Sequence, residues 1–513
     1  TRNIAVGNNA LDTPDTENDN LAIGYDALGG AIAGGEYNVA IGNYSMDALT
    51  SGDKNTGVGY NALTGVTSGS WNTAVGHEAG KAMTTGADNT ALGLSAGLAV
   101  TTGSRNIAIG GVALDAADAE NDNLAIGYAA LGGAINGGEY NVAIGNYSLD
   151  ALTSGDNNIA VGYNALTANT TGAYNVAVGY NALTANTEGE SNLAIGHVAL
   201  AENTTGNFNV GVGVSTLNGN IGGLRNTALG YGALDFPDTE NDNIAIGYDA
   251  LGGSIAGGEY NIAIGNYSMD ALTSGDNNTA IGYNAGTALT TGANNTLLGL
   301  RAGDVITTAD ENVIIGFDAD PSSNSTSNEI VIGFNATGQG TNQAVIGDAQ
   351  ITRVYIAQDG AGVLYANGTI QSSDRRIKKE INDLAYGLSF IKRLRPVSYY
   401  KLNPQDYPQE LKDKFYPNGN VRQVASEDYN KLQVGFIAQE VKAVIDEIDA
   451  ENNIVSIDED GFHRMDYEKI VVPLVKAVQE QQEQIDELRA QIKSLIAIQN
   501  QTPSDETMTG SDQ

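Results

Sequence analysis

One short pattern of apolar and polar positions recurs through the first two thirds of the chain. Its unit is Asn-x-Ala-(Val/Ile/Leu)-Gly-x-x-Ala-(Leu/Gly), first seen from Asn3 to Leu11, and a polar turn rich in Thr, Gly, Asp and Asn follows it. The glycine after Val, Ile or Leu occurs 21 times between Gly7 and Gly347, in steps of 17 residues apart from three steps of 18 and a last step of 14. A fixed period of this length is the signature of stacked repeats.

The pattern predicts an all-β repeat rod, a parallel β-solenoid in which each unit forms one turn with two short extended segments. A unit buries too little to fold alone, but stacked turns hydrogen-bond along the axis and align their Val and Ile side chains into a continuous core. Ala5, Gly7 and their equivalents then form a row of small side chains on the other face, which permits close approach of another backbone. The repeated asparagine suits a turn position where its side chain bonds the backbone. Strands about 4.8 Å apart would make the rod roughly 100 Å long.

Three near-identical acidic loops add a longer period to this rod. Their sequences are DTPDTENDN (12–20), DAADAENDN (115–123) and DFPDTENDN (235–243), and an 18-residue step, expected to form a local bulge, follows each one. Carboxylates together with Asn carbonyl oxygens are ligands that calcium prefers. The loops are therefore candidate calcium sites, and a solvated acidic turn is the alternative. The candidate ligands are Asp12, Asp15, Glu17, Asp19, Asp115, Asp118, Glu120, Asp122, Asp235, Asp238, Glu240 and Asp242.

Composition and charge exclude several classes of protein. The chain contains no cysteine, so it forms neither a disulfide nor a thiolate metal site. Its net charge is −36, and residues 1–350 hold only 6 basic against 35 acidic residues. A surface this acidic repels nucleic acid and anionic lipid, which argues against a nucleic-acid partner. No run of 18 apolar residues occurs, so we predict no membrane insertion.

Three ring-bearing residues of the repeat region are candidate sites. His77 and His197 follow the repeat glycine, and replacing the usual Tyr or Asn explains them better than metal ligation. Trp71, the single tryptophan, begins a repeat, where it serves either as an exposed platform for a sugar or in packing of the turn.

The pattern changes abruptly at the run SSDRRIKKEI (372–381). Ser373 and Lys378 place a hydroxyl and an amine five residues apart. Serine becomes a nucleophile when a base removes its proton, and lysine is such a base when burial or neighbouring cations such as Arg375 and Arg376 depress its pKa. The alternative interpretation is a helix N-terminus capped by Ser373 or Asp374.

The run SSDRRIKKEI is followed by RPVSYYKLN (395–403), GFIAQEV (435–441) and DYEKIVVPLVKAVQEQ (466–481). Together these blocks resemble the C-terminal intramolecular chaperone domain of phage endosialidases and tail fibres, a self-cleaving serine-lysine peptidase. The resemblance implies a cut between Ser372 and Ser373, with Ser373 as the nucleophile, Lys378 as its base, and Asp374, Arg375 and Arg376 in support. The repeats resemble the heads of trimeric autotransporter adhesins, which implies a left-handed, parallel and trimeric roll.

The last part of the chain carries an apolar stripe at heptad spacing. Alternating steps of four and three predict a coiled coil of about four heptads, and the stripe comprises Val471, Leu474, Val478, Gln481, Ile485, Leu488, Ile492 and Leu495. The expected domains are the repeat head (1–347), a β neck (348–372), an α+β chaperone and autopeptidase domain (373–466), a trimeric coiled coil (467–498) and a disordered tail (499–513).

These features lead to one functional hypothesis and two alternatives. We expect a homotrimeric, fibrous receptor-binding protein of a virion tail, whose C-terminal chaperone directs trimerisation and is released by self-cleavage. The expected partners are two further copies of the chain and a host cell-surface receptor, with a glycan as the expected class. Self-processing is the only enzymatic activity expected, without a substrate in trans. A bacterial surface adhesin with the same chaperone is the first alternative, and a glycan hydrolase is the second.

Overall fold

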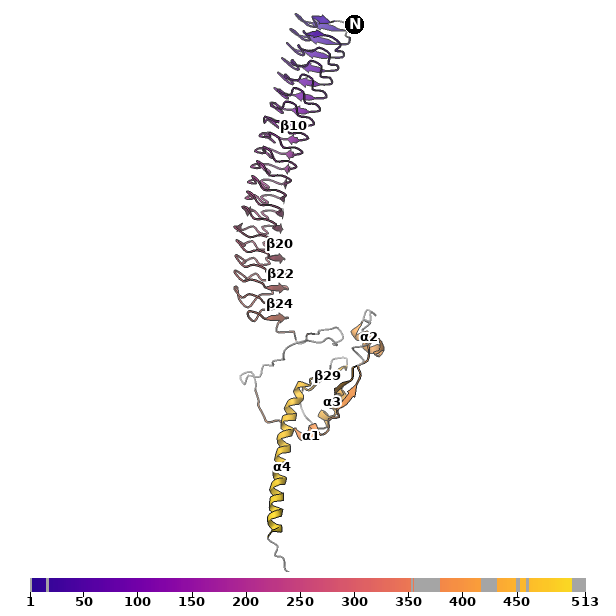
Figure 1. Ribbon diagram of the computed structural model, residues 1–513, viewed down its shortest axis with the longest axis vertical. Coiled ribbons are helices and arrows are strands. Elements are labelled where there is room, and N and C mark those ends of the chain that lie inside the picture. The colour runs from indigo at the N-terminus through magenta and orange to yellow at the C-terminus, as the bar shows by residue number, and fades with distance from the viewer. Residues whose placement is uncertain are drawn as a thin grey trace, which may run out of the picture. The chain divides into compact units, whose positions relative to one another are not determined.

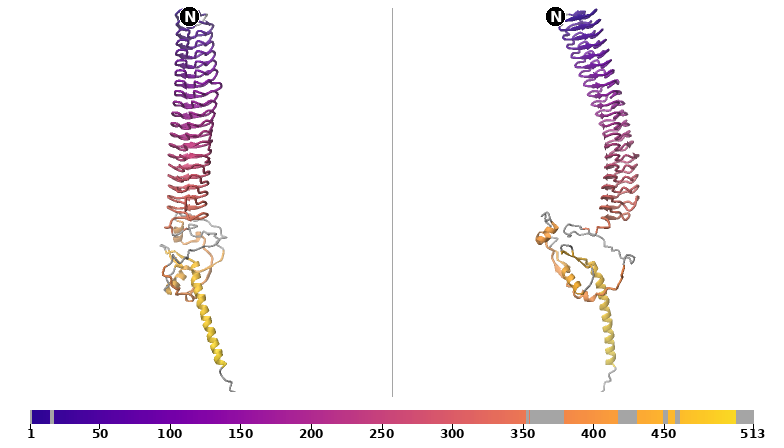
Figure 2. Two further views of the ribbon diagram at one scale, coloured as in Figure 1. Left: turned by 90° about the vertical axis from the view of Figure 1, so that its left-hand side faces the viewer. Right: turned by 180° about the vertical axis from the view of Figure 1, so that it is seen from behind.

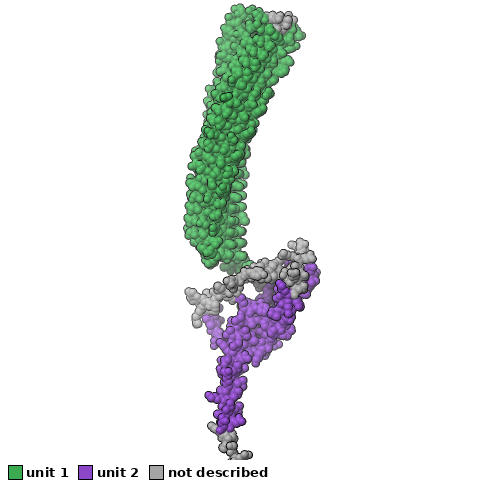
Figure 3. All heavy atoms as spheres, in the orientation of Figure 1, with its two compact units in different colours: residues 1–354 green, residues 355–513 purple. Residues whose placement is uncertain are grey.

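The computed structural model describes residues 2–14, 18–351, 354, 379–416, 431–448, 453–457 and 461–500. It divides into two compact units, Thr1–Val354 and Tyr355–Gln513, which Figure 3 colours separately. Each unit is described by itself below.

Unit 1 is a parallel β-solenoid whose turns stack into a long, gently curved coil (Figures 1 and 2). Each turn adds one three-residue strand to a single sheet of 21 strands, which matches the 21 sequence units. The strands are β1 (Ile4–Val6), β3 (Leu21–Ile23), β5 (Val39–Ile41), β6 (Thr56–Val58), β7 (Thr73–Val75), β8 (Thr90–Leu92), β9 (Ile107–Ile109), β10 (Leu124–Ile126), β11 (Val142–Ile144), β12 (Ile159–Val161), β13 (Val176–Val178), β14 (Leu193–Ile195), β15 (Val210–Val212), β16 (Thr227–Leu229), β18 (Ile244–Ile246), β20 (Ile262–Ile264), β21 (Thr279–Ile281), β22 (Thr296–Leu298), β23 (Val313–Ile315), β24 (Ile330–Ile332) and β25 (Ala344–Ile346).

Equivalent residues pair throughout this sheet, including across the longer repeats. Ala177 pairs with Ala194 across a 17-residue step, and Ala125 pairs with Ala143 across an 18-residue step. In the first and third acidic copies, two short parallel pairs form outside the main sheet. They are β2 (Thr13–Pro14) with β4 (Ala31–Ile32) and β17 (Phe236–Pro237) with β19 (Ser254–Ile255). The extra residue is therefore accommodated in the loops, and the register of the main sheet is unchanged.

The core of unit 1 is not the predicted one. The middle strand residue, such as Ala22, and the leucine of the following turn, such as Leu28, are fully buried, whereas Ile23 at the strand end is 37% exposed. Side chains alternate along a strand, and the asparagine before most of the strands, such as Asn20, is buried. The alanine therefore also points inward, and Val or Ile points out. The prediction of a Val and Ile core was wrong because this polar residue fixes the alternation.

The second predicted extended segment is also absent. The leucine that should have belonged to it, such as Leu28 or Leu183, lies in a turn with φ of 52° and 51° respectively. Burial of the leucine side chain offsets the cost of this left-handed conformation, which is of the order of 1–2 kcal/mol.

The repeat glycine is required by close approach of neighbouring turns, as predicted. Gly179 has φ of +146°, and a Cβ atom built on it would lie 2.2 Å from the carbonyl oxygen of Gly196 in the next turn. Any side chain at this position would push the stacked turns apart.

The repeated asparagines form a buried hydrogen-bond ladder along unit 1, which confirms their predicted contact with the backbone. The backbone N–H of Asn175 donates to Oδ1 of Asn158 at 3.0 Å, and the side-chain Nδ2 of Asn175 donates to the carbonyl of Gly189 at 2.7 Å. Asn192 repeats the contact one turn later by donating its backbone N–H to Oδ1 of Asn175. Each ladder asparagine thus satisfies polar groups of two adjacent turns.

Unit 2 has the predicted α+β character and ends in a long helix. Its elements are α1 (Leu388–Ile391), β26 (Val397–Tyr399), the 3-10 helix η2 (Pro404–Asp406), α2 (Gln409–Phe415), β27 (Gln433–Gly435), α3 (Ala438–Glu447), β28 (Val455–Ile457), β29 (His463–Met465), the 3-10 helix η4 (Glu468–Ile470) and α4 (Val471–Gln499). Its small core comprises Phe390, Val441, Ile445, Ile454 and Val455. None of the helices in the described ranges is long and apolar enough to cross a lipid bilayer.

Candidate functional site

The proposed cleavage site lies outside the described residues. Ser372, Ser373, Asp374, Arg375, Arg376 and Lys378 all belong to the undescribed range 355–378. The serine-lysine dyad therefore stays a prediction from sequence. What the structure describes is the framework that follows it.

The three other motif blocks of the chaperone meet in this framework. Strand β26 carries the RPVSYYKLN block and pairs antiparallel with β27, so that Val397 faces Gly435 at the start of the GFIAQEV block. The hydroxyl of Tyr467, from the third block, accepts the backbone N–H of Phe436 at 2.9 Å. Blocks that lie far apart in the sequence thus form one structural centre.

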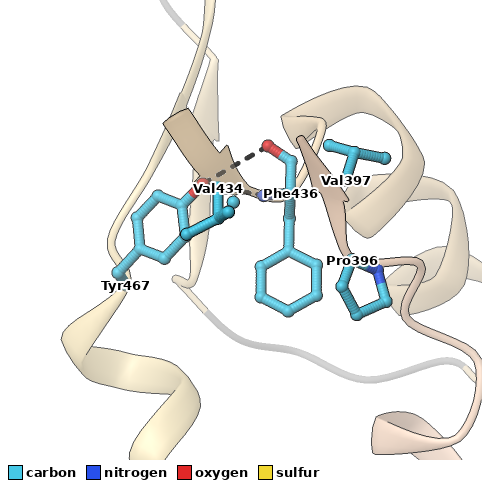
Figure 4. Close-up of a pocket in the computed structure, with 6 residues that line it drawn as sticks. Pro396, Val397, Val434, Phe436 and Tyr467 are labelled. Carbon is cyan, nitrogen blue, oxygen red and sulfur yellow. Dashed lines mark hydrogen bonds between the residues drawn. The ribbon is translucent and has the colours of Figure 1, made fainter. Parts of the chain in front are cut away.

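A pocket of about 430 Å³ opens at this centre (Figure 4). The lining is almost wholly apolar. The hydroxyl of Tyr467 also donates to the carbonyl oxygen of Phe436 at 3.4 Å, a contact drawn as a dashed line in Figure 4. The lining residues are Pro396, Val397, Val434, Gly435, Phe436 and Tyr467. Val434 is 81% exposed within the single chain, so this apolar surface lacks a cover there.

Sequence reasoning missed two contacts that hold this framework together, an ion pair and a backbone hydrogen bond to a carboxylate. The guanidinium of Arg395 makes a two-pronged contact with the carboxylate of Glu440, which lowers the pKa of Glu440. The backbone N–H of Leu388, at the start of α1, donates to Glu480 of α4 at 2.7 Å. Arg395 lies in the RPVSYYKLN block and Glu440 in the GFIAQEV block. Opposite charges in two different blocks could have predicted this ion pair from the sequence.

Helix α4 leaves its predicted stripe uncovered. Leu488, Ile492 and Leu495 are 56%, 55% and 65% exposed. Exposure of this apolar row to water is unfavourable. Association with identical helices would bury the row and gain about 25 cal/mol per Å² of apolar surface. The structure confirms the helix and leaves the stripe free for partner helices.

Unit 1 has a second, partly uncovered and mainly apolar surface, which we call the sheet face. It consists of the outward side chains at the first and third positions of the 21 strands, with threonine at the first position of six of them. Every one of these strands ends on Val, Ile or Leu, and none of these end residues is fully buried. A mainly apolar surface that runs the length of the sheet is typical of a surface that binds another protein.

Two columns of side chains flank the sheet face. The glycine-following column contains the residues just after the repeat glycine and is rich in rings that contact one another, as Tyr163 and Tyr180 do at 5.4 Å. His77 and His197 stack in this column on Tyr60 and Tyr180, which confirms that they replace its tyrosines.

The second column, called the asparagine-preceding column, contains the residue just before each ladder asparagine. Its charged members pair along the axis, as Arg105 does with Asp122 and Arg225 does with Asp242, both at 2.7 Å. Its aromatic members are Tyr37, Trp71, Tyr140, Tyr174, Phe208 and Tyr260, all at least half exposed.

Several of the candidate calcium ligands are held by contacts within the protein, and Asp15 and Glu17 are outside the described residues. Glu120 is buried and accepts the backbone N–H groups of Asp118 and Gly137, and Glu240 accepts those of Asp238, Thr239 and Gly257. Asp19, Asp122 and Asp242 pair with arginines. Asp12 is exposed, whereas Asp115 and Asp235 are half-buried. Within the described ranges, no group of three or more His, Asp or Glu residues is arranged to hold a metal ion, and calcium binding stays a prediction.

Comparison with protein families gives one match, in the C-terminal part of the chain. Residues 373–449 match the family described as chaperone of endosialidase. The match begins at Ser373 and spans β26, β27 and α3. None of the curated proteins compared matches the chain. A chaperone of this type implies a trimeric fibrous protein with a C-terminal chaperone, and the β-solenoid is a fibre of the expected kind.

Proposed function

We propose that this chain is a homotrimeric receptor-binding fibre of a phage tail, whose C-terminal domain assembles the trimer and is then released by self-cleavage between Ser372 and Ser373. The observation that carries the proposal is the coincidence of two uncovered apolar surfaces, the sheet face and the α4 stripe, on a chain that matches an endosialidase-type chaperone.

The sheet face supports association of identical chains. Its 21 turns repeat the same residues in register, so another copy of the rod presents a surface of matching length and period. Burial of a Val or Ile side chain stabilises by roughly 1.5–3 kcal/mol when complete, and the repeats multiply this gain. Nothing within the described residues of unit 1 covers the sheet face. The interior of unit 1 holds mainly alanine and leucine, so each single coil is narrow.

The need for a chaperone follows from the same regularity. Equivalent turns stack equally well in several registers, and one slip by a turn costs only the terminal contacts. Contacts between three chains also form late in folding. A trimeric α4 bundle next to the chaperone domain would align the three chains before their rods associate.

The proposed cleavage is an acyl shift followed by hydrolysis. The amine of Lys378 takes the hydroxyl proton of Ser373, whose Oγ attacks the carbonyl carbon of Ser372. The peptide C–N bond breaks, and the proton returns to the nitrogen that becomes the new N-terminus. Water then hydrolyses the ester and leaves a carboxylate on Ser372. Assembly would bury Lys378 beside Arg375 and Arg376 and lower its pKa from about 10.4, the ordinary value.

Mass spectrometry and light scattering of the expressed chain test this proposal together. We expect a trimer of rods, residues 1–372, and a separate fragment 373–513. A monomeric, intact chain would contradict both assembly and cleavage. The alternative, a bacterial surface adhesin with the same chaperone, predicts the same processing but a membrane anchor upstream of Thr1 in the full gene.

A further inference from the structure

The aromatic residues of the asparagine-preceding column have a backbone conformation that is unfavourable for bulky side chains. Trp71 and Tyr174 both have φ of 59°, and Phe208 has φ of 60°. A left-handed φ is tolerated by Asn, Asp and Gly, but in a bulky residue it is an outlier that costs of the order of 1 kcal/mol. Other turns have tolerant residues at this position, for example Asn277 and Asn294, and a few have charged or hydroxyl residues with the same φ, such as Arg105 and Ser191.

Packing of the rings does not offset this cost. Tyr174 is 61% exposed, Phe208 is 60% exposed and Trp71 is 55% exposed, in contrast to the buried leucines that share a left-handed φ in the core. Strained residues that the fold itself does not need are concentrated at functional sites. The rings are therefore better explained by a ligand than by the stability of the rod.

The spacing of the rings indicates a ligand that runs along the rod. Tyr140, Tyr174 and Phe208 are each two turns apart, which is about 10 Å at the separation of stacked strands. Asn157 and Ser191 occupy the intervening turns of the column. A regular series of separate rings with polar groups between them suits a polymer whose units alternate apolar faces and hydroxyl groups.

Charge narrows the class of polymer. Residues 1–350 hold 35 acidic and only 6 basic residues, and Arg105 and Arg225 in this column are already paired with Asp122 and Asp242. A polyanion would be repelled. Charged residues are depleted at the centre of protein interfaces, so the charged pairs of this column argue against a place at the centre of the proposed trimer contact.

We propose that the asparagine-preceding column of unit 1 binds a neutral, extended polysaccharide, with Tyr140, Tyr174 and Phe208 as successive stacking platforms and Asn157 and Ser191 as hydrogen-bonding groups between them. Trp71 and Tyr37 lie two turns apart in the same column, but the amine of Lys54 between them lies 5.4 Å from the centre of the Trp71 ring, in a cation–π contact, so this pair is not included among the platforms. The nonpolar face of a sugar ring packs on an aromatic ring, while its hydroxyls bond the polar side chains. This inference deepens the proposed receptor binding and rests on it.

Substitution by asparagine tests the platforms without disturbing the fold, because asparagine occupies the same column elsewhere. The full-length chain would be passed over immobilised cellohexaose, chitohexaose, dextran, mannan and galactan, with hyaluronan as an acidic probe. We expect the parent to bind at least one neutral probe. Tyr174→Asn should weaken that binding about tenfold, equal to about 1.4 kcal/mol. The triple variant with asparagine at Tyr140, Tyr174 and Phe208 should abolish it. Tyr174→Phe and the column control Asn294→Ser should bind like the parent.

The outcomes separate this inference from the proposed function. A trimer that self-cleaves but binds none of the neutral probes, or that binds one equally well as the triple variant, overturns the platform inference and leaves the fibre proposal standing. Binding to hyaluronan alone also overturns it. A chain that remains monomeric and uncut defeats the proposed function whatever it binds.

Discussion

The buried asparagine ladder makes a quantitative prediction about the stability of unit 1. Replacing Asn175 by alanine removes the acceptor of the Asn192 backbone N–H, at 3.0 Å, and the donor to the Gly189 carbonyl, at 2.7 Å. Asn192 is 1% exposed and Asn175 is fully buried, so water does not replace the lost partners. Each orphaned polar group costs about 1–3 kcal/mol, which predicts a local loss of about 2–6 kcal/mol.

Hydrogen exchange followed by mass spectrometry measures this loss where it occurs. Contacts in a solenoid are made between neighbouring turns, so we expect faster exchange in the turns around β13 and β14 and little change several turns away. Thr171→Ala is a matched control, because Thr171 is exposed and lies in the same turn as Asn175. Unchanged exchange near residue 175 in the asparagine variant, or equal acceleration in the threonine control, would refute the ladder as a source of stability.

Three further predictions concern charge, metal and assembly. Burial, aided by the negative charges of Asp249 and Glu202, raises the pKa of Asp235 to about 6 in the folded chain, above its ordinary 3.8. Above pH 6 the carboxylate is charged, and its charge opposes folding. Asp235→Asn should therefore raise the melting temperature at pH 8 but lose that advantage near pH 4. If the acidic loops bind calcium, calorimetric titration should show heat and a chelator should lower the melting temperature; no heat and no chelator effect would make them solvated turns. Leu488→Asp should place a charge in the α4 stripe and reduce trimer yield, whereas Glu487→Asp on the same helix should not; equal yields would exclude a role for the stripe.

The sequence alone predicted the number of turns and their register, because a glycine that tolerates no side chain recurs at a nearly constant spacing. It failed on which side chains face inward. Ala22 and Ile23 are both apolar, so hydrophobicity does not choose between them. The choice is made by the buried Asn20, whose side chain satisfies backbone groups inside the coil, as its 2.8 Å bond to the Gly35 carbonyl shows.

The candidate sites were also predicted only in part. Motif order was enough to predict a chaperone-like C-terminal region of α+β character, and the strands and helices of unit 2 have that character. The contact of Tyr467 with Phe436 and the Arg395 to Glu440 pair depend on the packing of distant blocks, which spacing does not determine. Apart from Trp71, which the sequence alone marked as a candidate platform, the rings of the asparagine-preceding column stood out only when their left-handed φ was known.

The measurement that tests the central claim most directly is the intact mass of the chain after trimerisation, for the parent and for Ser373→Ala and Lys378→Ala. The account predicts two fragments from the parent, 1–372 and 373–513, and whole chains in trimers of either variant. A parent chain that stays whole after forming trimers, or a variant cut at the same bond, would show that the segment is a structural clamp without the proposed dyad chemistry.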